Sequence, residues 1–509
     1  MIRNFLTVGG WTMISRILGF LRDILFAAFL GAGPAAEAFV VAFSLPNMFR
    51  RFFAEGAFNM AFVPMFAKKL EAGEDATGFA KDAISGLAGI LLIFTLVAQL
   101  AMPWLILAMA SGFRGDERFD LALVYGRIVF AYIIFISLAA LVSGVLNSAG
   151  KFAAAAAAPV LLNVVLIAAM GAAHWQGWDI GLALAYAVLV AGVLQLALVW
   201  RAASRAGFSL SLRMPRMTDE LKQLAVIAAP AALAGGVIQV NLLVGRQVAS
   251  FFDGSIQYLN LADRLYQLPL GVVAIAIGVV LLPELARKLR SGDEVGGQSA
   301  FNRATEFALV LTVPAAVALV VIPLPLVSVL FERGAFSAAD ALATAPALAI
   351  YGLGLPSFVL QKVLQPLFFA RADTKTPFRI AVKGMVVNAV LAVGLAFVFD
   401  YLAAAIATSV AGWYMVWLLW RASRDMGASA EIDARLRHRV GRIIAASLAM
   451  GAVLAVVAWA INGWLFEPGL RYLALAGLVA IGAVSYIGLA HATGAMTVSD
   501  LRGAVRSGR

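Results

Sequence analysis

The sequence predicts an all-α polytopic membrane protein, with about fourteen transmembrane helices in two six-helix bundles plus two C-terminal helices. Three observations lead to this class. Hydrophobic residues make up 62% of the 509 residues, charged residues only 13%, and the mean hydropathy is +0.92, whereas a soluble protein of this size needs a more charged surface. Apolar runs of about 20 residues, the length that crosses a bilayer, recur from end to end. Two stretches of sequence also recur at nearly constant spacing.

The expected spans are apolar windows bounded by Gly, Pro or charged residues. No long soluble domain interrupts them, because the longest polar stretches are Ser291–Arg303 and Arg421–Arg442. The approximate ranges are 5–30, 38–66, 82–110, 122–147, 153–173, 180–201, 222–249, 257–286, 304–331, 341–370, 378–399, 401–421, 441–463 and 471–492.

The loops between these spans alternate between basic and nearly neutral. The neutral set includes GAGPAAE, RGDERFD and HWQGWD. The positive-inside rule places the basic set and both termini in the cytoplasm. The net charge of +11 is therefore expected to face anionic lipid rather than nucleic acid. The N-terminus is expected to lack a cleavable signal, because Arg16 and Arg22 interrupt its apolar stretch.

An internal repeat determines the expected domains. Residues 63–74, VPMFAKKLEAGE, resemble residues 282–293, LPELARKLRSGD, and a second pair of stretches aligns Asn163 with Asn388; the offsets are 219 and 225 positions. Two copies of six spans have the same orientation and form parallel bundles with a cavity between them; chance similarity among apolar helices is the alternative. The expected domains are residues 1–215 and 216–430 for the bundles, and 431–509 for two further helices and a short cytoplasmic tail.

Charged side chains inside the first span need an explanation. Each charge costs roughly 2.5–3.5 kcal/mol at the centre of a membrane helix. Ser15 and Arg22 are seven residues apart and share a helix face, and Arg16 and Asp23 share the neighbouring face. The span therefore carries one broad polar stripe.

The second span, EAFVVAFSLPNMFRRFFAEGAFNMAFVP, contains a proline and several polar residues. Pro46 favours a kink. Asn47 and Arg50 follow it and share a face, so Arg50 is chosen as the inward-facing arginine. Glu37 lies at the outer end of the span and Glu55 toward the other end.

Span eight, LNLADRLYQLPLG, adds Asp263 and Arg264. A guanidinium group stays charged and its planar fork suits phosphate oxygens, whereas helices that need only adhesion use Ser, Thr or Asn at lower cost. Arginines that converge from several helices therefore predict a site for a phosphate or pyrophosphate group. Structural ion pairs between helices are the alternative for the acids. The candidate substrate-binding residues are Ser15, Arg16, Arg22, Asp23, Glu37, Asn47, Arg50, Glu55, Asp263 and Arg264.

The stretches SRILGFLRD, AFSLPNMFRRFFAEGAF and ADRLYQLPLG, with the fourteen-span layout, resemble the MurJ (MviN) family of the MOP exporter superfamily. This resemblance implies a flippase of the bacterial inner membrane. It would move lipid II, the undecaprenyl-pyrophosphate-linked disaccharide-pentapeptide precursor of peptidoglycan, from the cytoplasmic to the periplasmic face by alternating access. It also implies that the two last helices form a groove for the prenyl tail.

The resemblance assigns roles to particular residues. Asp23 corresponds to the acidic neighbour of the cavity arginines, and Glu37 stands where the family usually carries Asp. Span eleven, FRIAVKGMVVNAVL, contains no carboxylate, so the sodium site of certain relatives is not carried over. The cavity arginines of the family correspond to Arg16, Arg22, Arg50 and Arg264.

Other functions remain as alternatives. They are a flippase for another prenyl-linked glycan, a cation-coupled multidrug exporter on the same scaffold, and a membrane glycosyltransferase or polymerase, which needs catalytic carboxylates in a large outer loop. No enzyme activity, cofactor or metal is expected, because the chain has no cysteine, no GxxxxGK[ST] loop and no HExxH pair. Transport is expected to depend on the membrane potential or an ion gradient. The expected partners are lipid II, membrane lipids and cell-wall synthesis proteins.

Overall fold

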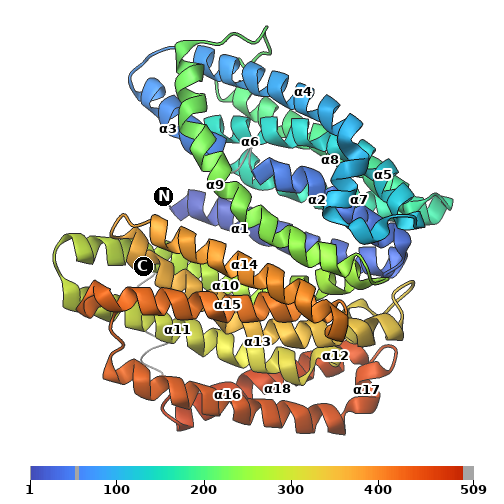
Figure 1. The fold of residues 1–509 in the computed structure, drawn as a ribbon, viewed down its shortest axis with the longest axis vertical. Helices are drawn as coiled ribbons and strands as arrows, with labels where there is room; N and C mark the ends of the chain where they lie inside the picture. Colours follow the sequence, from blue (N-terminus) through green and yellow to red (C-terminus); the bar gives the residue numbers. More distant parts are fainter. Residues whose placement is uncertain (1, 52–56, 497–509) are drawn as a thin grey trace. The chain divides into compact units, whose positions relative to one another are not determined.

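The computed structural model describes residues 2–51 and 57–496, which are helical apart from short turns; an isolated bridge joins Arg333 and Phe336. Figure 1 shows the helices. The first part of the chain forms α1 (Ile2–Leu30), α2 (Pro34–Arg50), α3 (Ala57–Glu71), α4 (Ala76–Met109), η2 (Ser111–Phe113), α5 (Glu117–Phe130), α6 (Tyr132–Ser148), α7 (Ala153–Gln176), α8 (Ile180–Arg205) and α9 (Asp219–Ala249). The rest forms α10 (Ser255–Arg290), α11 (Glu294–Val321), α12 (Pro323–Phe331), α13 (Ala338–Phe369), α14 (Lys375–Phe399), α15 (Leu402–Ser423), η3 (Arg424–Met426), η4 (Ala428–Ala430), α16 (Ala434–Ala460), α17 (Asn462–Phe466) and α18 (Arg471–Ala492).

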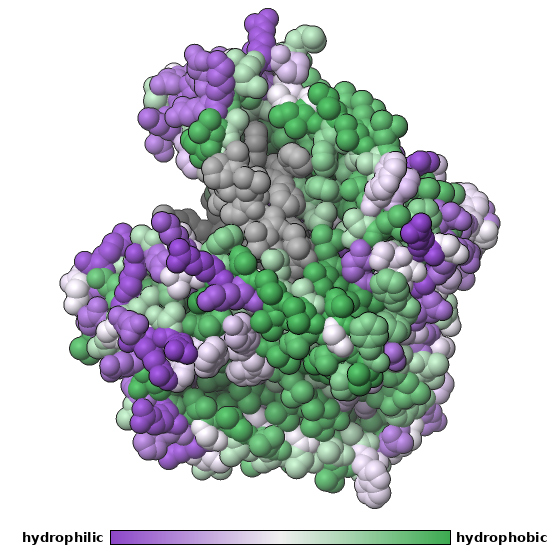
Figure 2. Space-filling view, in the orientation of Figure 1, coloured by the Kyte–Doolittle hydropathy of each residue, from purple (hydrophilic) through white to green (hydrophobic). Residues whose placement is uncertain are grey.

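The helices confirm an all-α multi-pass membrane protein. Within the described residues, ten helical segments are long and apolar enough to cross a bilayer. Every predicted span overlaps a helix; the four predicted spans outside these ten correspond to α1, to α2 with α3, to α9 and to α10. Large hydrophobic side chains such as Ile93 on α4 and Phe397 on α14 are exposed. Figure 2 shows hydrophobic side chains over much of the visible face and hydrophilic ones gathered toward helix ends.

Several helices begin before the predicted span. Helices α4, α11 and α16 start six to ten residues earlier than the hydropathy windows indicate. In each, an aspartate accepts a hydrogen bond from the backbone N–H three residues on: Asp75 at 2.7 Å, Asp293 at 2.8 Å and Asp433 at 2.6 Å. Hydropathy locates the part of a helix in lipid, whereas the capping residue determines where the helix begins. The predicted span 304–331 is divided at Ile322, because Pro323 starts α12.

The turns between helices repeat along the chain. Among the described residues of the first part, a positive φ occurs six times, and each has a counterpart with positive φ 219–223 positions later. Glycine occupies this conformation without strain, whereas other residues pay a cost. Ala372 and Asp400, the non-glycine residues with positive φ in the described chain, stand where the first copy has Gly150 and Gly177. The pairs are Gly31 and Gly254, Gly73 and Gly292, Gly115 and Gly334, Gly150 and Ala372, Gly177 and Asp400, and Gly207 and Gly427.

The chain divides into two compact units. Unit 1 contains the residues up to Gln257 together with Arg333–Phe336, and unit 2 contains Tyr258–Glu332 and the residues from Ser337 onward. Helix α9 falls in unit 1, whereas the boundary expected at residue 215 would place it in the second bundle. Helix α9 packs against α3, α4 and η2. Gln247 in its last turn accepts a hydrogen bond from Ser111 N over 2.7 Å.

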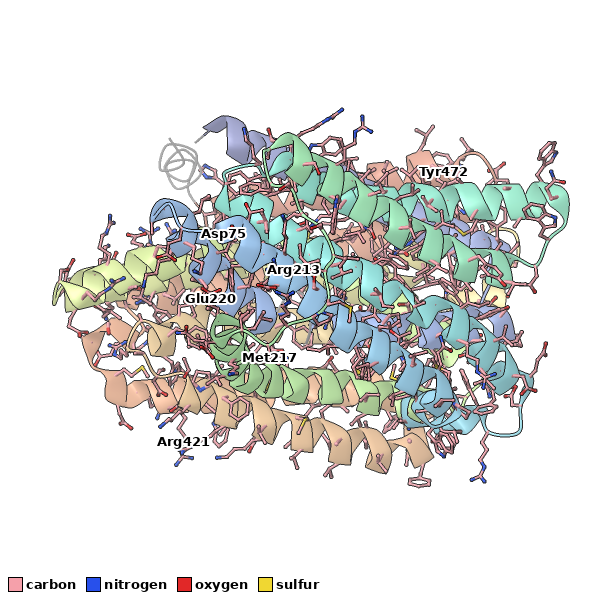
Figure 3. The ribbon with its side chains drawn as sticks, turned by 90° about the horizontal axis from the view of Figure 1, so that it is seen from above. Asp75, Arg213, Met217, Glu220, Arg421 and Tyr472 are labelled. Carbon is pink, nitrogen blue, oxygen red and sulfur yellow. The ribbon has the colours of Figure 1, made fainter. Side chains whose placement is uncertain are left out.

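The segment between α8 and α9 is fastened to α4. Arg213 forms an ion pair with Asp82, donates to the Gly78 carbonyl over 2.9 Å, and its backbone N–H donates to Ser85 Oγ over 2.9 Å. Figure 3 shows Arg213 near the start of α4 and Glu220 near the start of α9. The segment before α9 is therefore bound to α4, and Gln247 in the last turn of α9 is bound to Ser111. These contacts at both ends attach α9 to unit 1.

In unit 2, α16 packs against α11, and α18 packs against α16. Tyr486 on α18 donates a hydrogen bond to the buried Val310 carbonyl over 2.8 Å. The buried carboxylate of Glu306 on α11 forms ion pairs with Arg303, Arg435 and Arg439. The two helices that follow the internal repeat are therefore attached to unit 2 by charge as well as by apolar packing.

Candidate anion-binding site

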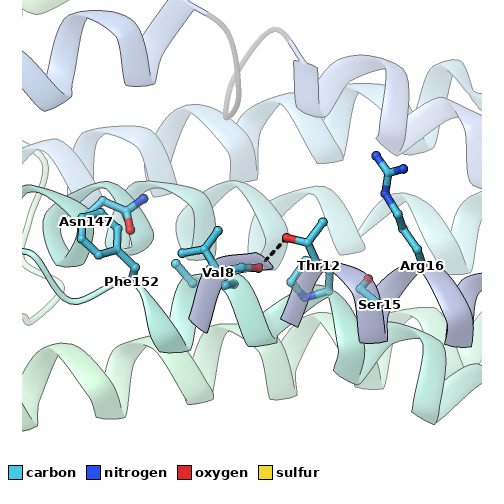
Figure 4. A pocket seen from close by; sticks show the side chains of 9 residues that line it. Val8, Thr12, Ser15, Arg16, Asn147 and Phe152 are labelled. Atoms are coloured by element: carbon cyan, nitrogen blue, oxygen red, sulfur yellow. Dashed lines mark hydrogen bonds between the residues drawn. The ribbon is translucent and has the colours of Figure 1, made fainter. Parts of the chain in front are cut away.

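A pocket with both polar and apolar walls lies beside the first half of α1 in unit 1. It has a volume of about 340 Å³ and is lined by α1, the end of α6 and the start of α7. Ser15 and Arg16 both line it, and Figure 4 shows the Arg16 side chain extending from α1. Asn147 and Phe152 close the side formed by α6 and α7. Thr12 turns its hydroxyl to the Val8 carbonyl, 2.8 Å away. The pocket thus combines one exposed guanidinium group with neutral walls.

Arg22 lies two turns further along α1, about 9 Å from Arg16 along the helix axis. Its Nε and Nη2 donate to Asp23 Oδ1 over 3.1 and 2.6 Å, and its Nη1 donates to Asn163 Oδ1 over 3.1 Å. Asn163 is buried on α7 and donates in turn to the Ser15 carbonyl over 3.0 Å. A Cβ atom on Gly19 would lie 3.6 Å from the Asn163 amide, an ordinary van der Waals contact, so Asn163 packs directly beside Gly19 of α1. The Arg22 side chain is thereby held in one orientation.

The donor inventory of Arg22 shows what it can bind. A guanidinium group has five N–H donors, and the contacts with Asp23 and Asn163 use three of them. Two N–H groups remain for a ligand. Because the side chain is only 16% exposed and already oriented, little rotamer freedom is lost when a phosphate oxygen binds. Asp23 also balances the charge of Arg22 when the site is empty.

The second helix contributes differently from the prediction. Asn47 lines a smaller pocket together with Arg51 and Arg246, whereas Arg50 is half-buried at the end of α2 and is not part of that lining. Residues three or four positions apart lie on the same face of a helix, so Asn47 can share a face with either Arg50 or Arg51. In the structure Asn47 and Arg51 line the same pocket.

Glu37 is occupied by a structural ion pair. Its carboxylate is buried and accepts hydrogen bonds from Arg118 Nη1 over 3.0 Å and from Ile256 N over 2.9 Å. Arg118 also pairs with Asp116 and Asp253. The structure therefore supports the alternative reading of an ion pair between helices for Glu37. The sequence does not single out Arg118, because RGDERFD indicates a loop whose net charge alone bears on the topology. The structure places Arg118 in the first turn of α5, where it reaches Glu37 on α2.

The remaining predicted residues lie elsewhere. Asp263 and Arg264 are half-buried on α10 in unit 2, where Gln267 donates a hydrogen bond to Asp263. The rings of Tyr266 and Tyr351 lie nearby in unit 2, 5.1 Å apart. Glu55 lies outside the described residues. Unit 1 thus brings Ser15, Arg16, Arg22 and Asp23 together on α1.

A metal centre is not evident in the described residues. Among them, no group of three or more His, Cys, Asp or Glu side chains could hold a metal ion. The guanidinium groups of Arg16 and Arg22 are cationic donors that suit an anionic ligand.

Comparison with known proteins gives consistent results. The family model described as "Lipid II flippase MurJ" matches residues 26–477. A probable lipid II flippase MurJ of Rhizobium meliloti (strain 1021) is 44% identical over 525 aligned positions, covering 100% of this chain and 97% of that protein. The lipid II flippase MurJ of Burkholderia cenocepacia is 38% identical and covers 76% of this chain and 77% of its own.

Solved structures share the same fold. "Lipid II flippase MurJ, inward closed conformation" aligns with a TM-score of 0.80 and 25% identity, covering 95% of this chain and 98% of that one. An inward-facing multidrug resistance MATE transporter of the MOP superfamily aligns with a TM-score of 0.67 at 17% identity, over 82% of this chain and 95% of that one. The second likeness concerns the fold alone.

Proposed function

Because this chain belongs to the MurJ family of lipid II flippases, we propose that it carries lipid II across the bacterial inner membrane by alternating access, binding the pyrophosphate through cationic side chains of α1. The single observation that carries the binding role is the arrangement of Arg22. Its guanidinium group is oriented by Asp23 and Asn163 and keeps two N–H donors for a ligand. A charge-assisted, oriented guanidinium is the group that best recognises a phosphate.

The pocket beside α1 supports this role. Its 340 Å³ can hold a diphosphate and the adjoining part of a sugar, but not the whole glycopeptide. Arg16 at the wall and Arg22 two turns away would neutralise successive phosphates and replace their water of hydration. Most of the head group would remain outside this pocket, and the prenyl tail would stay in the bilayer.

The two-bundle layout is also part of the proposal. Turns with positive φ recur at an offset of 219–223 residues, which supports two copies of a six-span unit. The two weak sequence matches have nearly the same offset. We place both termini and the basic loops in the cytoplasm by their charge. α16 and α18, which follow the second copy and pack on α11 or each other, would form the groove for the prenyl tail. The family resemblance also makes Arg50, Arg264, Asp263 and Glu55 candidate substrate-binding residues.

The membrane potential can supply the driving force without a resident cofactor. Each charge that crosses the full potential changes the free energy by about 2.3 kcal/mol per 100 mV. An inside-negative potential would draw an empty, positively charged site back to the inward-facing state. Binding of the anionic pyrophosphate removes this bias and lets the loaded carrier turn outward.

The test is depletion of the protein in its own cell, followed by complementation. Depletion should cause lipid II to accumulate on the cytoplasmic face, and the wild-type gene should restore its delivery to the outer face. Arg22→Glu should fail to restore delivery although the protein is inserted at normal levels. Full delivery by Arg22→Glu would refute the binding role of the arginine, and accumulation of a different prenyl-linked glycan would identify another substrate.

A further inference from the structure

Unit 1 contains a second cationic pocket that the sequence did not single out. It has a volume of about 100 Å³, and its lining comes from α2, the end of α4 and the end of α9. The polar groups in this lining are the guanidinium groups of Arg51 and Arg246, the amide of Asn47 and the hydroxyl of Ser44. Asn47 and Ser44 each use a donor on an α2 carbonyl, at 2.9 and 2.6 Å. Met48, Met109 and Leu243 supply the apolar wall.

This pocket lies toward the opposite end of the bundle from the first one. Successive spans alternate in direction, so the last residues of α4 and α9 lie at one end and the α6–α7 turn at the other. Met109 is the last residue of α4 and Arg246 is in the last turn of α9, and Gln247 beside it bonds to the Leu107 carbonyl over 2.9 Å. The first pocket contains Asn147 and Phe152 from the α6–α7 turn. With the orientation proposed above, the first pocket is on the cytoplasmic side and the second is nearer the outer side.

We propose that the pocket formed by Arg51, Arg246 and Asn47 is a second anion subsite, which receives a phosphate group of the prenyl pyrophosphate after it leaves Arg16 and Arg22. This inference rests on the proposed function and extends it by a release-side site. Two guanidinium groups from different helices, α2 and α9, match the charge of a diphosphate, and the volume has room for one phosphate group. A single strong site would hold the anion and slow its release. Two anion-binding sites of similar chemistry divide the release of the anion into two smaller steps.

The experiment counts bound anions on the purified full-length chain. Farnesyl pyrophosphate is the probe, and native mass spectrometry reports how many molecules bind to each chain. The wild type should bind two. The double variant Arg51→Gln with Arg246→Gln should lose one of them, with at least a tenfold loss in affinity, and Arg16→Gln with Arg22→Gln should lose the other.

Matched controls separate a site from general charge. Arg114→Gln removes one positive charge from an exposed position in the turn after α4, as each single arginine variant does, and it should keep both bound molecules. Arg246→Lys keeps the charge but loses the planar fork, so it should bind more weakly than wild type and more tightly than Arg246→Gln. Unchanged melting temperatures show that each variant is folded.

The outcomes are distinct. Two bound molecules in the Arg51→Gln, Arg246→Gln variant, or equal losses in that variant and in Arg114→Gln, overturn the second subsite. A wild type that binds one molecule, lost only when Arg16 and Arg22 are changed, overturns the second subsite and leaves the proposed function intact. A wild type that binds no farnesyl pyrophosphate, together with normal lipid II delivery in depleted cells, contradicts both proposals.

Discussion

Asn163 on α7 accepts a hydrogen bond from the Arg22 guanidinium on α1 over 3.1 Å, and the same amide donates to the Ser15 carbonyl over 3.0 Å. One buried side chain therefore orients the candidate phosphate ligand and fastens the helix that carries it. Neither contact is local, since 141 residues separate the two side chains.

Asn163→Ala should reduce transport by about tenfold while Arg22 remains present. A hydrogen bond to a charged group contributes roughly 1.5–3 kcal/mol, and its loss lets the guanidinium group rotate away from the ligand. The measurement is lipid II delivery at saturating and at low substrate, together with the melting temperature. A variant that loses stability but transports normally per folded molecule would show that Asn163 serves only helix packing.

Arg118→Gln should destabilise the protein by about 3–5 kcal/mol, because it leaves the buried Glu37 carboxylate without its cation. Glu37→Gln should cost less, since Arg118 keeps Asp116. The double variant should recover part of the loss. Thermal unfolding in detergent measures the three changes. If Glu37→Gln abolished transport at unchanged stability, Glu37 would be a substrate ligand after all.

Ala372→Gly should stabilise the protein by about 1 kcal/mol. A φ of 57° costs an L-residue roughly 1–2 kcal/mol, and glycine removes this strain. Glycine also raises the conformational entropy of the unfolded chain, which lowers the free energy of unfolding by only about 0.4–1 kcal/mol. Gly150→Ala, at the equivalent turn of the first copy, should destabilise although nothing lies within 4 Å of the added Cβ. Opposite shifts in melting temperature would support the equivalence of the two turns, and shifts of the same sign would contradict it.

The stabilising effect of Glu74 should disappear in acid. Lys69 at the end of α3 lies 2.9 Å from Glu74 and 2.7 Å from Glu220, and the hydrogen bond from Lys69 lowers the pKa of Glu74 below 4.5. A carboxyl whose pKa is lowered by folding stabilises the protein above its unfolded pKa, and this contribution is lost as the pH falls through the folded pKa. Glu74→Gln should therefore melt slightly below wild type at pH 7 and equal to it well below pH 4.5.

The corresponding effect of Lys69 has the opposite sign. Its pKa is raised above 10.5, chiefly by the hydrogen bond to Glu220, so its contribution is present at neutral pH and is lost as the pH rises through the raised value. A melting temperature of the Glu74→Gln protein that differs from wild type equally at pH 3 and pH 7 would contradict the assignment.

The sequence by itself determined the all-helical class, the positions of most spans and the family. Lipid forces each span to satisfy its own backbone hydrogen bonds within a helix, so hydropathy along the chain locates spans such as α7 and α8 without reference to any other helix. The motifs around Arg16, Arg22 and Arg50 likewise led to the MurJ family, which the comparisons confirm.

Only the tertiary structure decided which charged groups meet. Glu37 and Arg118 lie 81 residues apart, and Asn47 faces Arg51 and Arg246 rather than Arg50 alone. Such pairs depend on how helices rotate and pack against one another, and α9 joined unit 1 through contacts at both of its ends. A helical repeat shows which residues share a face, but the neighbour that this face meets is set by packing between segments that are distant along the chain.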